Sequence, residues 1–545
     1  MATASTNSRA GKPKRRPTNA AQGNETGSSS SGVAATPADG ISDSGRAGGE
    51  LSPRAWWIAY ASVMLVAAFV RLFQLQLRPL HHDEGVNGFF LNNLMRTGLF
   101  NYDPSNYHGP TLYYFTLPFA RLAEHFQLLD AWVVRFIPVV FGMATVRLAL
   151  RLRRYLGTVG ALAAAALLAL SPGVVFFSRY YIHEMMFAFF TLAVVVAALR
   201  LYETGGAETP SDAQRWIEPL IIGVALPAIT QYAVHIAQFV LNLSGIFSGT
   251  ANFAFSLPSY LVIFGLVALL PLLVVYEGAR SIYVILGAVS AALLFATKET
   301  AFISLGVILI AWALTWAYAA IVRRQARLSG REPVNARARR KQGAKGSATA
   351  TESDGDSRSL VERLGGWHRL GILSVAALGI FFSVNILFYS SFFTNPKGVG
   401  DSLKAFDIWT KTGKSAFHAK PVYMYVKWLL QEESPLLALA SLGALVAVWR
   451  VRRNRFALFA AMWGFGLLAA YSLINYKTPW LLLSMLVPFA LTGGYAIDVI
   501  YKANRAAALA ALGLALAVCA FQTYRINFVH YDDDTYIYVY AHTKR

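Results

Sequence analysis

The sequence predicts an all-α polytopic membrane protein with about thirteen transmembrane helices. Of its 545 residues, 55% are hydrophobic and only 14% are charged, whereas soluble proteins carry roughly a quarter charged residues. Long apolar runs recur along the chain, as in YLVIFGLVALLPLLVVY at 260–276, and about 17–25 such residues cross a bilayer as a helix. The sequence shows no series of short alternating segments, which an outer-membrane barrel would require.

Cysteine and charge usage restrict the class further. The single cysteine, Cys519, lies inside an apolar run, which excludes intramolecular disulfides and cysteine-rich metal sites. The net charge of +20 is concentrated in polar segments. Residues 1–50 predict a disordered cytoplasmic tail, and residues 323–368 predict a basic cytoplasmic loop. No aromatic residues are interleaved with the charges at 323–358, so we predict no nucleic-acid partner.

Basic loops predict the orientation, because Lys and Arg are enriched on the cytoplasmic side. RLRR (151–154), RVRRNR (450–455) and KANR (502–505) are such loops. The first span, 55–75, leaves from a cytoplasmic N-terminus and places the following segment, LHHDEGVNGFF at 80–90, outside.

Parity then determines the next elements. Two apolar stretches, 109–126 and 131–150, separate this outer segment from the inner RLRR. If both crossed the membrane, RLRR would lie outside, so only one of them is a transmembrane span. The stretch 108–126 contains Pro110 and Pro118. We therefore predict that it lies along the outer interface, together with the amphipathic segment 84–97.

The remaining spans alternate and place the protein in the plasma membrane with an outer C-terminus. We predict an N-terminal module (51–322, with an outer loop at 78–130), a C-terminal module (369–521, with an outer loop at 390–432) and a short outer tail (522–545). The predicted spans are 55–75, 131–150, 156–173, 183–202, 217–242, 260–276, 281–297, 301–322, 369–389, 434–449, 456–473, 479–500 and 506–521.

This topology collects unusual polar residues on the outer side. Charges near a bilayer are costly unless they are paired or lie in an aqueous cavity, so their shared side predicts an outward-opening cavity. Each feature alone also has a structural explanation, such as a helix cap, a local ion pair or snorkelling to lipid headgroups. The residues are Asp83, Glu84, His108, Arg179, His183, Glu184, Lys298, Glu299 and Lys477.

Such a cavity suits a sugar carried on an isoprenoid phosphate, whose reactive carbon lies at headgroup depth. Transfer to a hydroxyl needs a base for the acceptor and cations for the phosphate leaving group. We predict Asp83 as the base. No Walker loop or G-x-G-x-x-G pattern indicates a nucleotide donor.

The other predicted site residues fall into three groups. The donor phosphate is expected to bind Arg179, Lys298 and Lys477. Candidate ligands for a divalent metal, the one cofactor considered, are His183, Glu184 and His108. Candidates for binding acceptor or substrate are His82, Tyr107, His108, Tyr476 and Trp480.

Several motifs resemble those of the GT-C membrane glycosyltransferases, of the protein O-mannosyltransferase and aminoarabinose transferase type. HHDEGV matches their Asp-Glu motif, and Arg179 followed by Glu184 matches a second motif that usually ends in aspartate. HDEGVNGFFLNNLMRTGLFNYDPSNYHGPTLYY, ATKET and NYKTPWLLL are similar to a prokaryotic family associated with flippase activity in archaeal-type N-glycosylation. The resemblance covers roughly residues 55–540 and implies a GT-C-like bundle, with Glu84 and Glu184 supporting Asp83 in catalysis.

We therefore expect a glycosyltransferase that moves a sugar from a polyprenyl-phosphate donor to a protein, lipid or glycan acceptor at the extracytoplasmic face. A lipid-linked oligosaccharide flippase and a non-catalytic accessory protein remain as alternatives. A transporter usually carries polar residues near the bilayer midplane on broken helices, whereas these residues gather at one face. The span 217–242, interrupted by Pro219, Pro227 and His235, is the feature that favours transport.

Overall fold

The computed structural model describes residues 51–106, 108–205, 212–243, 256–329, 360–414 and 419–539. Within these ranges every regular element is a helix, and the strand-like pairing is limited to one bridge, between Ala419 and Tyr476. The predicted all-α class is confirmed. The elements are α1 (Pro53–Leu72), α2 (His82–Thr97), α3 (Thr111–His125), α4 (Ala131–Leu150), α5 (Arg153–Leu156), α6 (Thr158–Leu170), α7 (Pro172–Ser178), α8 (Glu184–Glu203), α9 (Asp212–Leu243), α10 (Ser256–Glu277), η1 (Gly278–Arg280), α11 (Ser281–Phe295), α12 (Ala301–Leu328), α14 (Leu360–Arg363), α15 (Gly366–Tyr389), α16 (Lys397–Lys414), α17 (Met424–Glu432), α18 (Ser434–Trp449), α19 (Arg455–Leu473), η2 (Pro479–Leu482), α20 (Leu483–Ala503), α21 (Arg505–Tyr524) and η3 (Arg525–Val529).

Some predictions concern residues outside these ranges. The tail at 1–50, residues 330–359 of the basic loop, and Tyr107 are among them. Their predicted roles stay predictions.

The apolar helices make this a multi-pass membrane protein. In the described ranges, 10 helical stretches are long and apolar enough to cross a membrane, or up to 12 if the bent pairs α6–α7 and α17–α18 each form one span. The predicted count of thirteen is not confirmed. The difference lies at 260–295, which we predicted as two spans and which counts here as one stretch of 36 residues. The 3-10 turn η1 interrupts this stretch.

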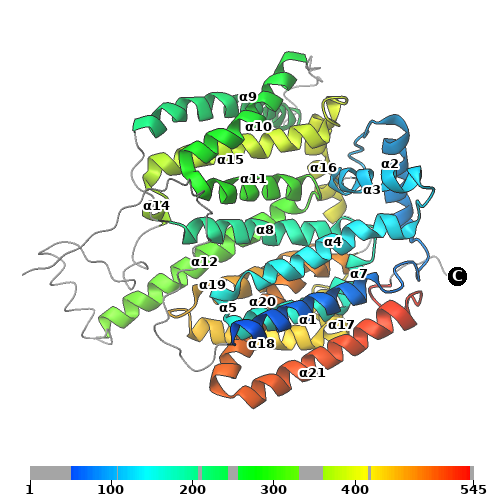
Figure 1. Cartoon of the computed structure of the whole chain (residues 1–545), viewed down its shortest axis with the longest axis vertical. Helices are drawn as coiled ribbons and strands as arrows, with labels where there is room; N and C mark the ends of the chain where they lie inside the picture. Colours follow the sequence, from blue (N-terminus) through cyan, green and yellow to red (C-terminus); the bar gives the residue numbers. More distant parts are fainter. Residues whose placement is uncertain are drawn as a thin grey trace, which may run out of the picture. The chain divides into compact units, whose positions relative to one another are not determined.

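Neither α2 nor α3 belongs to the apolar stretches that could span a membrane. These helices correspond to the predicted interfacial segments 84–97 and 108–126. In Figure 1, α2 lies at one end of the bundle and runs across the direction of α4 and α8. α3 packs between α2 and α4. This arrangement agrees with a single crossing, by α4, between the HHDE segment and RLRR.

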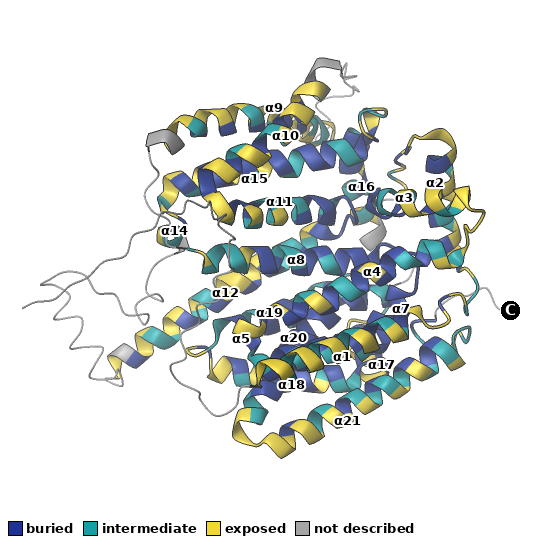
Figure 2. Ribbon diagram, in the orientation of Figure 1, coloured by how far each residue is buried: buried dark blue, intermediate teal, exposed yellow. Residues whose placement is uncertain are grey.

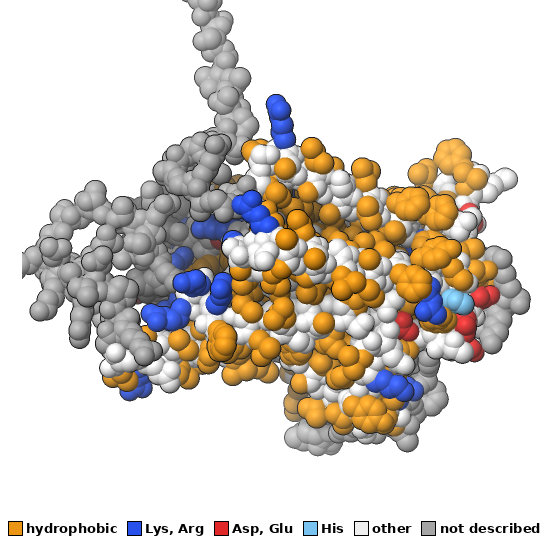
Figure 3. Space-filling view, turned by 90° about the horizontal axis from the view of Figure 1, so that it is seen from below, with side chains coloured by type: hydrophobic (Ala, Val, Ile, Leu, Met, Phe, Trp, Pro, Cys, Tyr) orange, Lys and Arg blue, Asp and Glu red, His pale blue; other side chains and the backbone are white. Residues whose placement is uncertain are grey.

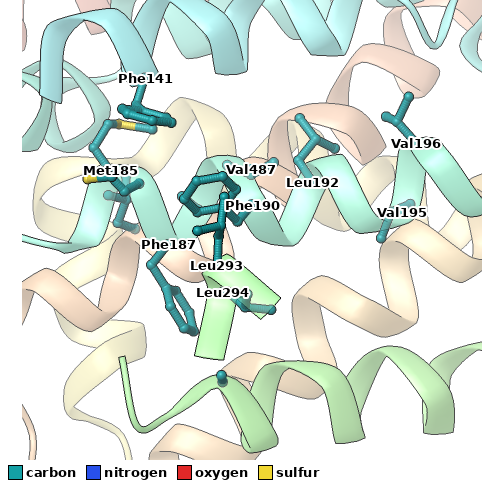
Figure 4. Packing of buried hydrophobic residues seen from close by; sticks show 14 of the residues in the cluster. Phe141, Met185, Phe187, Phe190, Leu192, Val195, Val196, Leu293, Leu294 and Val487 are labelled. Atoms are coloured by element: carbon teal, nitrogen blue, oxygen red, sulfur yellow. The ribbon is translucent and has the colours of Figure 1, made fainter. Parts of the chain in front are cut away.

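The centre of the bundle is formed by α8 and α20, whereas α1 and α21 lie on its outside (Figure 2). Hydrophobic side chains of α8 interlock with those of α4, α11 and α20 (Figure 4). The outer helices instead expose large apolar side chains such as Leu65 on α1 and Leu514 on α21. In a membrane protein such surfaces face lipid, which is as apolar as they are.

The two ends of α8 differ in their charged neighbours. Glu184 begins this helix of 20 residues, and Glu203, about 30 Å away, ends it. At that far end Glu203 pairs with Arg200 at 2.8 Å and with Arg154 at 3.9 Å. Figure 3 shows Lys and Arg gathered mainly at one end of a hydrophobic belt, and Asp, Glu and His at the other. The Glu184 end and the basic end are therefore about one bilayer thickness apart.

Buried charges hold the break between α6 and α7, which bends the chain by 60°. The guanidinium of Arg71 donates to the carbonyl oxygens of Leu168 and Ala169 at the end of α6, at 3.0 and 3.1 Å. Across the break, the Glu433 carboxylate accepts from the Ser171 hydroxyl at 2.9 Å and from the Gly173 N–H at 2.8 Å. The C-terminal end of α6 thus meets the positive charge that its dipole favours, and the start of α7 meets a carboxyl group that accepts its hydrogen bonds. The break directs α7 toward the segment RYYIHE (179–184).

Candidate active site

One cavity of about 470 Å³ lies where the polar motifs meet. Its wall is built from the start of α2, the segment before α3, the start of α8, the α11–α12 loop, α16, and the segment from the end of α19 to η2. It brings together segments that are up to 400 residues apart in the sequence. The lining residues are His81, His82, Asp83, Val86, Asn87, Ser105, Asn106, His108, Ile182, His183, Glu184, Lys298, Glu299, Thr300, Trp409, Tyr471, Ile474, Tyr476, Thr478, Trp480 and Leu481.

The first turn of α2 directs its two carboxylates to different places. His81 caps the helix, since its Nδ1 accepts from the Asp83 backbone N–H at 3.0 Å. Successive helical residues point about 100° apart. Asp83 lines the cavity with a side chain 38% exposed, whereas the Glu84 side chain is fully buried on the other side.

Glu84 forms a bidentate ion pair with Arg135 of α4. The guanidinium donates from Nε to Oε1 at 2.8 Å and from Nη2 to Oε2 at 2.7 Å. The carboxylate also accepts from the backbone N–H groups of His81 and Tyr181, at 3.0 and 2.9 Å. Burial raises the pKa of Glu84, but the hydrogen bonds and charge of Arg135 outweigh it and hold the pKa below its ordinary value.

The predicted role of Glu84, to support Asp83 in catalysis, stays a prediction, and the geometry makes any such role indirect. The residue does not line the cavity, and its oxygens are occupied by the guanidinium and by backbone donors. It therefore joins α2, α4 and the segment RYYIHE, and acts on the site by positioning Asp83.

Gly109 joins three of the sequence motifs. Its N–H donates to the carbonyl oxygen of Thr297 at 3.1 Å, and its carbonyl oxygen accepts from His183 Nε2 at 3.0 Å. The neighbouring Thr111 N–H and hydroxyl donate to the carbonyl oxygen of Ala296 at 3.2 and 2.6 Å. A Cβ on Gly109 would overlap that same carbonyl oxygen. The glycine of YHGP thus allows ATKET and RYYIHE to meet.

We expect Gly109→Ala to destabilise the protein, because the methyl group must displace backbone of the α11–α12 loop. Overpacking of this kind costs roughly 1–3 kcal/mol, which thermal unfolding in detergent would register. The matched control is Gly85→Ala in α2, where a Cβ meets nothing within 4 Å. That change should be neutral or stabilise by up to about 1 kcal/mol, since alanine favours a helix. Equal midpoints for the two variants would contradict this account of Gly109.

Two cross-element charge contacts lie on the cavity wall. Lys298 Nζ contacts Glu184 Oε1 at 2.5 Å, and His108 Nδ1 lies 3.2 Å from Glu299 Oε2. Burial lowers the pKa of Lys298, but the carboxylates of Glu184 and Glu299 outweigh it and hold the pKa above its ordinary value. Lys298 is therefore an ammonium at neutral pH. Glu184, which the resemblance predicts to support Asp83 in catalysis, holds this lysine through its carboxylate.

His183 is a neutral imidazole. Burial lowers its pKa well below the ordinary value, and its Nε2–H donates to the Gly109 carbonyl oxygen. The proton therefore resides on Nε2. Within the described residues, the buried Nδ1 has no hydrogen-bond partner.

The predicted metal ligands do not fit a resident divalent ion. Nε2 of His183 is engaged with a carbonyl oxygen, and Glu184 is paired with an ammonium. His108 faces Glu299. In the described part of the chain, no group of three or more His, Cys, Asp or Glu side chains is placed to hold a metal.

Of the three cations predicted to bind phosphate, Lys298 lines the cavity and the other two do not. The Arg179 guanidinium donates to four carbonyl oxygens at the end of α1, including those of Phe73 at 2.6 Å and Gln74 at 2.8 Å. Lys477 is buried and donates to the Ile474 carbonyl oxygen. These contacts correct both predictions, since they assign Arg179 and Lys477 to chain positioning.

The predicted substrate-binding residues His82, His108, Tyr476 and Trp480 all line the cavity. Sequence reasoning missed other lining residues. Asn87 follows Asp83 by four residues, which places both on one face of α2 and was a usable signal. Trp409 lies on α16 outside any motif that we had recognised. The missed polar or aromatic residues are His81, Asn87, Ser105, Asn106, Thr300, Trp409, Tyr471 and Thr478.

The fold and the cavity define a multi-pass membrane protein with a polar site at one end of its bundle. Residues 111–230 match the family model of dolichyl-phosphate-mannose-protein mannosyltransferases. This segment runs from the start of α3 into α9 and contains RYYIHE. The match confirms the resemblance to GT-C membrane glycosyltransferases that the motifs predicted. No curated protein matches the chain in sequence.

Among solved structures, the chain is similar to ArnT from Cupriavidus metallidurans in the apo state, at 14% identity and a TM-score of 0.47, over 84% of this chain and 62% of that one. The form bound to undecaprenyl phosphate has the same identity of 14% and TM-score of 0.47, over 86% of this chain and 64% of that one. A third structure is the archaeal oligosaccharyltransferase AglB from Archaeoglobus fulgidus, in complex with an inhibitory peptide and a dolichol-phosphate. Its identity is 14% and its TM-score 0.43, over 90% of this chain and 56% of that one. The present chain spans less than two thirds of the length of these proteins.

Proposed function

We propose that the protein transfers a sugar from a polyprenyl-phosphate donor to an acceptor at the extracytoplasmic face of the plasma membrane. The observation that carries the proposal is the cavity itself, which combines an accessible carboxylate, Asp83, with a buried ammonium, Lys298. These are the base and the cation that transfer from a phosphate requires. The family match over 111–230 supports the reaction class.

In the proposed reaction, Asp83 takes the proton of an acceptor nucleophile, which attacks the anomeric carbon of the sugar. The bond from that carbon to the phosphate oxygen breaks, and the electron pair leaves with the polyprenyl phosphate. An ammonium has three N–H donors, and one of those of Lys298 is engaged with Glu184. The others are able to hold the negative charge that grows on the phosphate.

The cavity also contains surfaces suited to the body of a sugar. The rings of Trp409, Tyr476 and Trp480 form part of its wall, next to the polar side chains Asn87 and Asn106. Binding sites for small molecules commonly combine such apolar surface with a few placed polar groups.

Orientation follows from the charge distribution, because the basic loops at the far end of α8 favour the cytoplasm. Cysteines introduced at Asn101 and Phe126 should therefore label from outside, and a cysteine at Arg452 from the cytoplasm. Labelling by a membrane-impermeant maleimide in cells measures this. The native Cys519 is buried and gives a low background. Cytoplasmic labelling of position 126 would contradict the interfacial placement of α3.

The experiment that tests the proposed function uses the full chain in liposomes with labelled polyprenyl-phosphate sugars and candidate peptide, lipid or glycan acceptors. We expect transfer without any nucleotide and release of polyprenyl phosphate. Absence of transfer across a broad set of sugars and acceptors, with the protein folded, would contradict the proposal.

A second candidate is a flippase for lipid-linked oligosaccharides. The observation that favours it is a pair of broken helices, α6–α7 and α17–α18, bent by 60° and 112° and joined by the buried Glu433. Transporters place their sites at such breaks. The same liposomes separate the candidates, because a flippase would move the labelled lipid across the bilayer without cleaving its sugar–phosphate bond.

A further inference from the structure

We propose that Lys298 takes the place of a divalent metal ion in this cavity, so that a side-chain ammonium compensates the carboxylate of Glu184 beside that of Glu299. The catalytic meaning of this inference rests on the proposed transferase function. The metal-binding behaviour that it predicts is measured on the purified protein with metal ions alone, without donor or acceptor.

The three side chains come from separate positions in the fold. Glu184 begins α8, and Lys298 and Glu299 form the loop between α11 and α12. All three line the cavity and are almost fully buried, with exposures of 6%, 3% and 4%. Buried carboxylates are strongly unfavourable unless a cation pairs with them. The contact between Lys298 Nζ and Glu184 Oε1, at 2.5 Å, supplies that cation.

The charge arrangement leaves little room for an added metal ion. The ammonium pairs with Glu184, and the second carboxylate, Glu299, faces His108. A divalent ion bound to Glu184 would lie beside this fixed positive charge in a poorly solvated site, where repulsion is weakly screened.

Removal of the ammonium would remove this repulsion against a divalent ion. Glu184 and Glu299 would then present uncompensated carboxylate oxygens on one wall of the cavity, with the His108 imidazole beside them. Carboxylate oxygens are ligands that suit Mn²⁺. These side chains are not placed to hold a metal while Lys298 lies among them. In Lys298→Met, which removes the charge but keeps the length of the side chain, we expect them to turn toward the former ammonium position and form a metal site that the natural protein lacks.

The experiment titrates Mn²⁺ into the purified full-length chain in detergent and follows the loss of the free-ion signal by electron paramagnetic resonance. We expect no stoichiometric binding to the natural protein or to Lys298→Arg, which retains a cation. Lys298→Met should bind about one ion per chain. Adding Glu184→Gln to Lys298→Met should weaken that binding by roughly tenfold or more.

Two results would overturn the inference. One is stoichiometric Mn²⁺ binding by the natural protein that is lost in Glu184→Gln. The other is a folded Lys298→Met variant that binds no metal. If this variant does not fold, Lys298→Gln, which retains a donor for Glu184, replaces it under the same criteria. Because no donor or acceptor is present, failure here leaves the transfer reaction to be judged separately by the liposome assay.

Discussion

Asp83→Asn is expected to abolish sugar transfer while the protein stays folded. The amide keeps the shape of the side chain but cannot accept the proton of the acceptor nucleophile. Loss of a general base lowers rates by about 100-fold or more. Asp83 is 38% exposed on the cavity side of α2, and its side chain makes no part of the buried Glu84 ion pair. The thermal midpoint in detergent should therefore change little.

The measurement compares transfer rates in liposomes that contain equal amounts of folded protein. The matched control is Glu124→Gln, which removes another carboxylate at the end of α3, in an exposed pair with Arg121. Full activity in Asp83→Asn would show that Asp83 is not the base. Equal loss of activity and of folded protein would instead identify it as a structural cap of α2.

Glu84→Ala is expected to cause a large loss of stability. It leaves the Arg135 guanidinium buried without its counter-charge, and it removes the acceptor for the Tyr181 N–H. Breaking one side of a buried ion pair costs about 3–5 kcal/mol. The control, Glu124→Ala, breaks an exposed pair, which is worth about 0–1 kcal/mol. Thermal unfolding that is equally mild in both variants would contradict the positioning role of Glu84.

The same residue predicts a pH dependence. The pKa of Glu84 is lower in the folded protein than in the unfolded chain, where it is about 4.3. Its contribution is therefore fully present above roughly pH 4.3 and is lost as the pH falls through the folded value. Glu84→Gln should flatten this acid limb of the stability profile. An unchanged limb would mean that other carboxylates produce it.

The sequence predicted the membrane class, most of the spans and the gathering of Asp83, His108, Glu184 and Lys298. These features depend on apolar runs and basic loops, which are local in the sequence and together assign each loop to one side of the membrane. The two interfacial helices were predicted from the number of membrane crossings allowed between the HHDE segment and RLRR. The predicted spans 260–276 and 281–297 meet at the 3-10 turn at 278–280, although the apolar character of 260–295 continues across it as one stretch of 36 residues.

Side-chain roles were harder to predict, because they depend on partners distant in sequence. Glu84 finds its guanidinium 51 residues later, and Arg179 binds carbonyl oxygens more than 100 residues earlier. A sequence reveals neither contact, so both residues were read as parts of the site. Gly109 shows the converse, since its importance comes from the carbonyl group of Ala296.

The central claim is that this cavity binds the phosphate of a polyprenyl-phosphate sugar. The most direct measurement is a cryo-electron microscopy structure of the full chain with polyprenyl phosphate bound. We predict that a phosphate oxygen lies within hydrogen-bond distance of Lys298 Nζ, with the adjoining space bounded by Asp83 and Trp480. A phosphate bound elsewhere, with the cavity unchanged and Lys298 contacting Glu184 alone, would contradict the account.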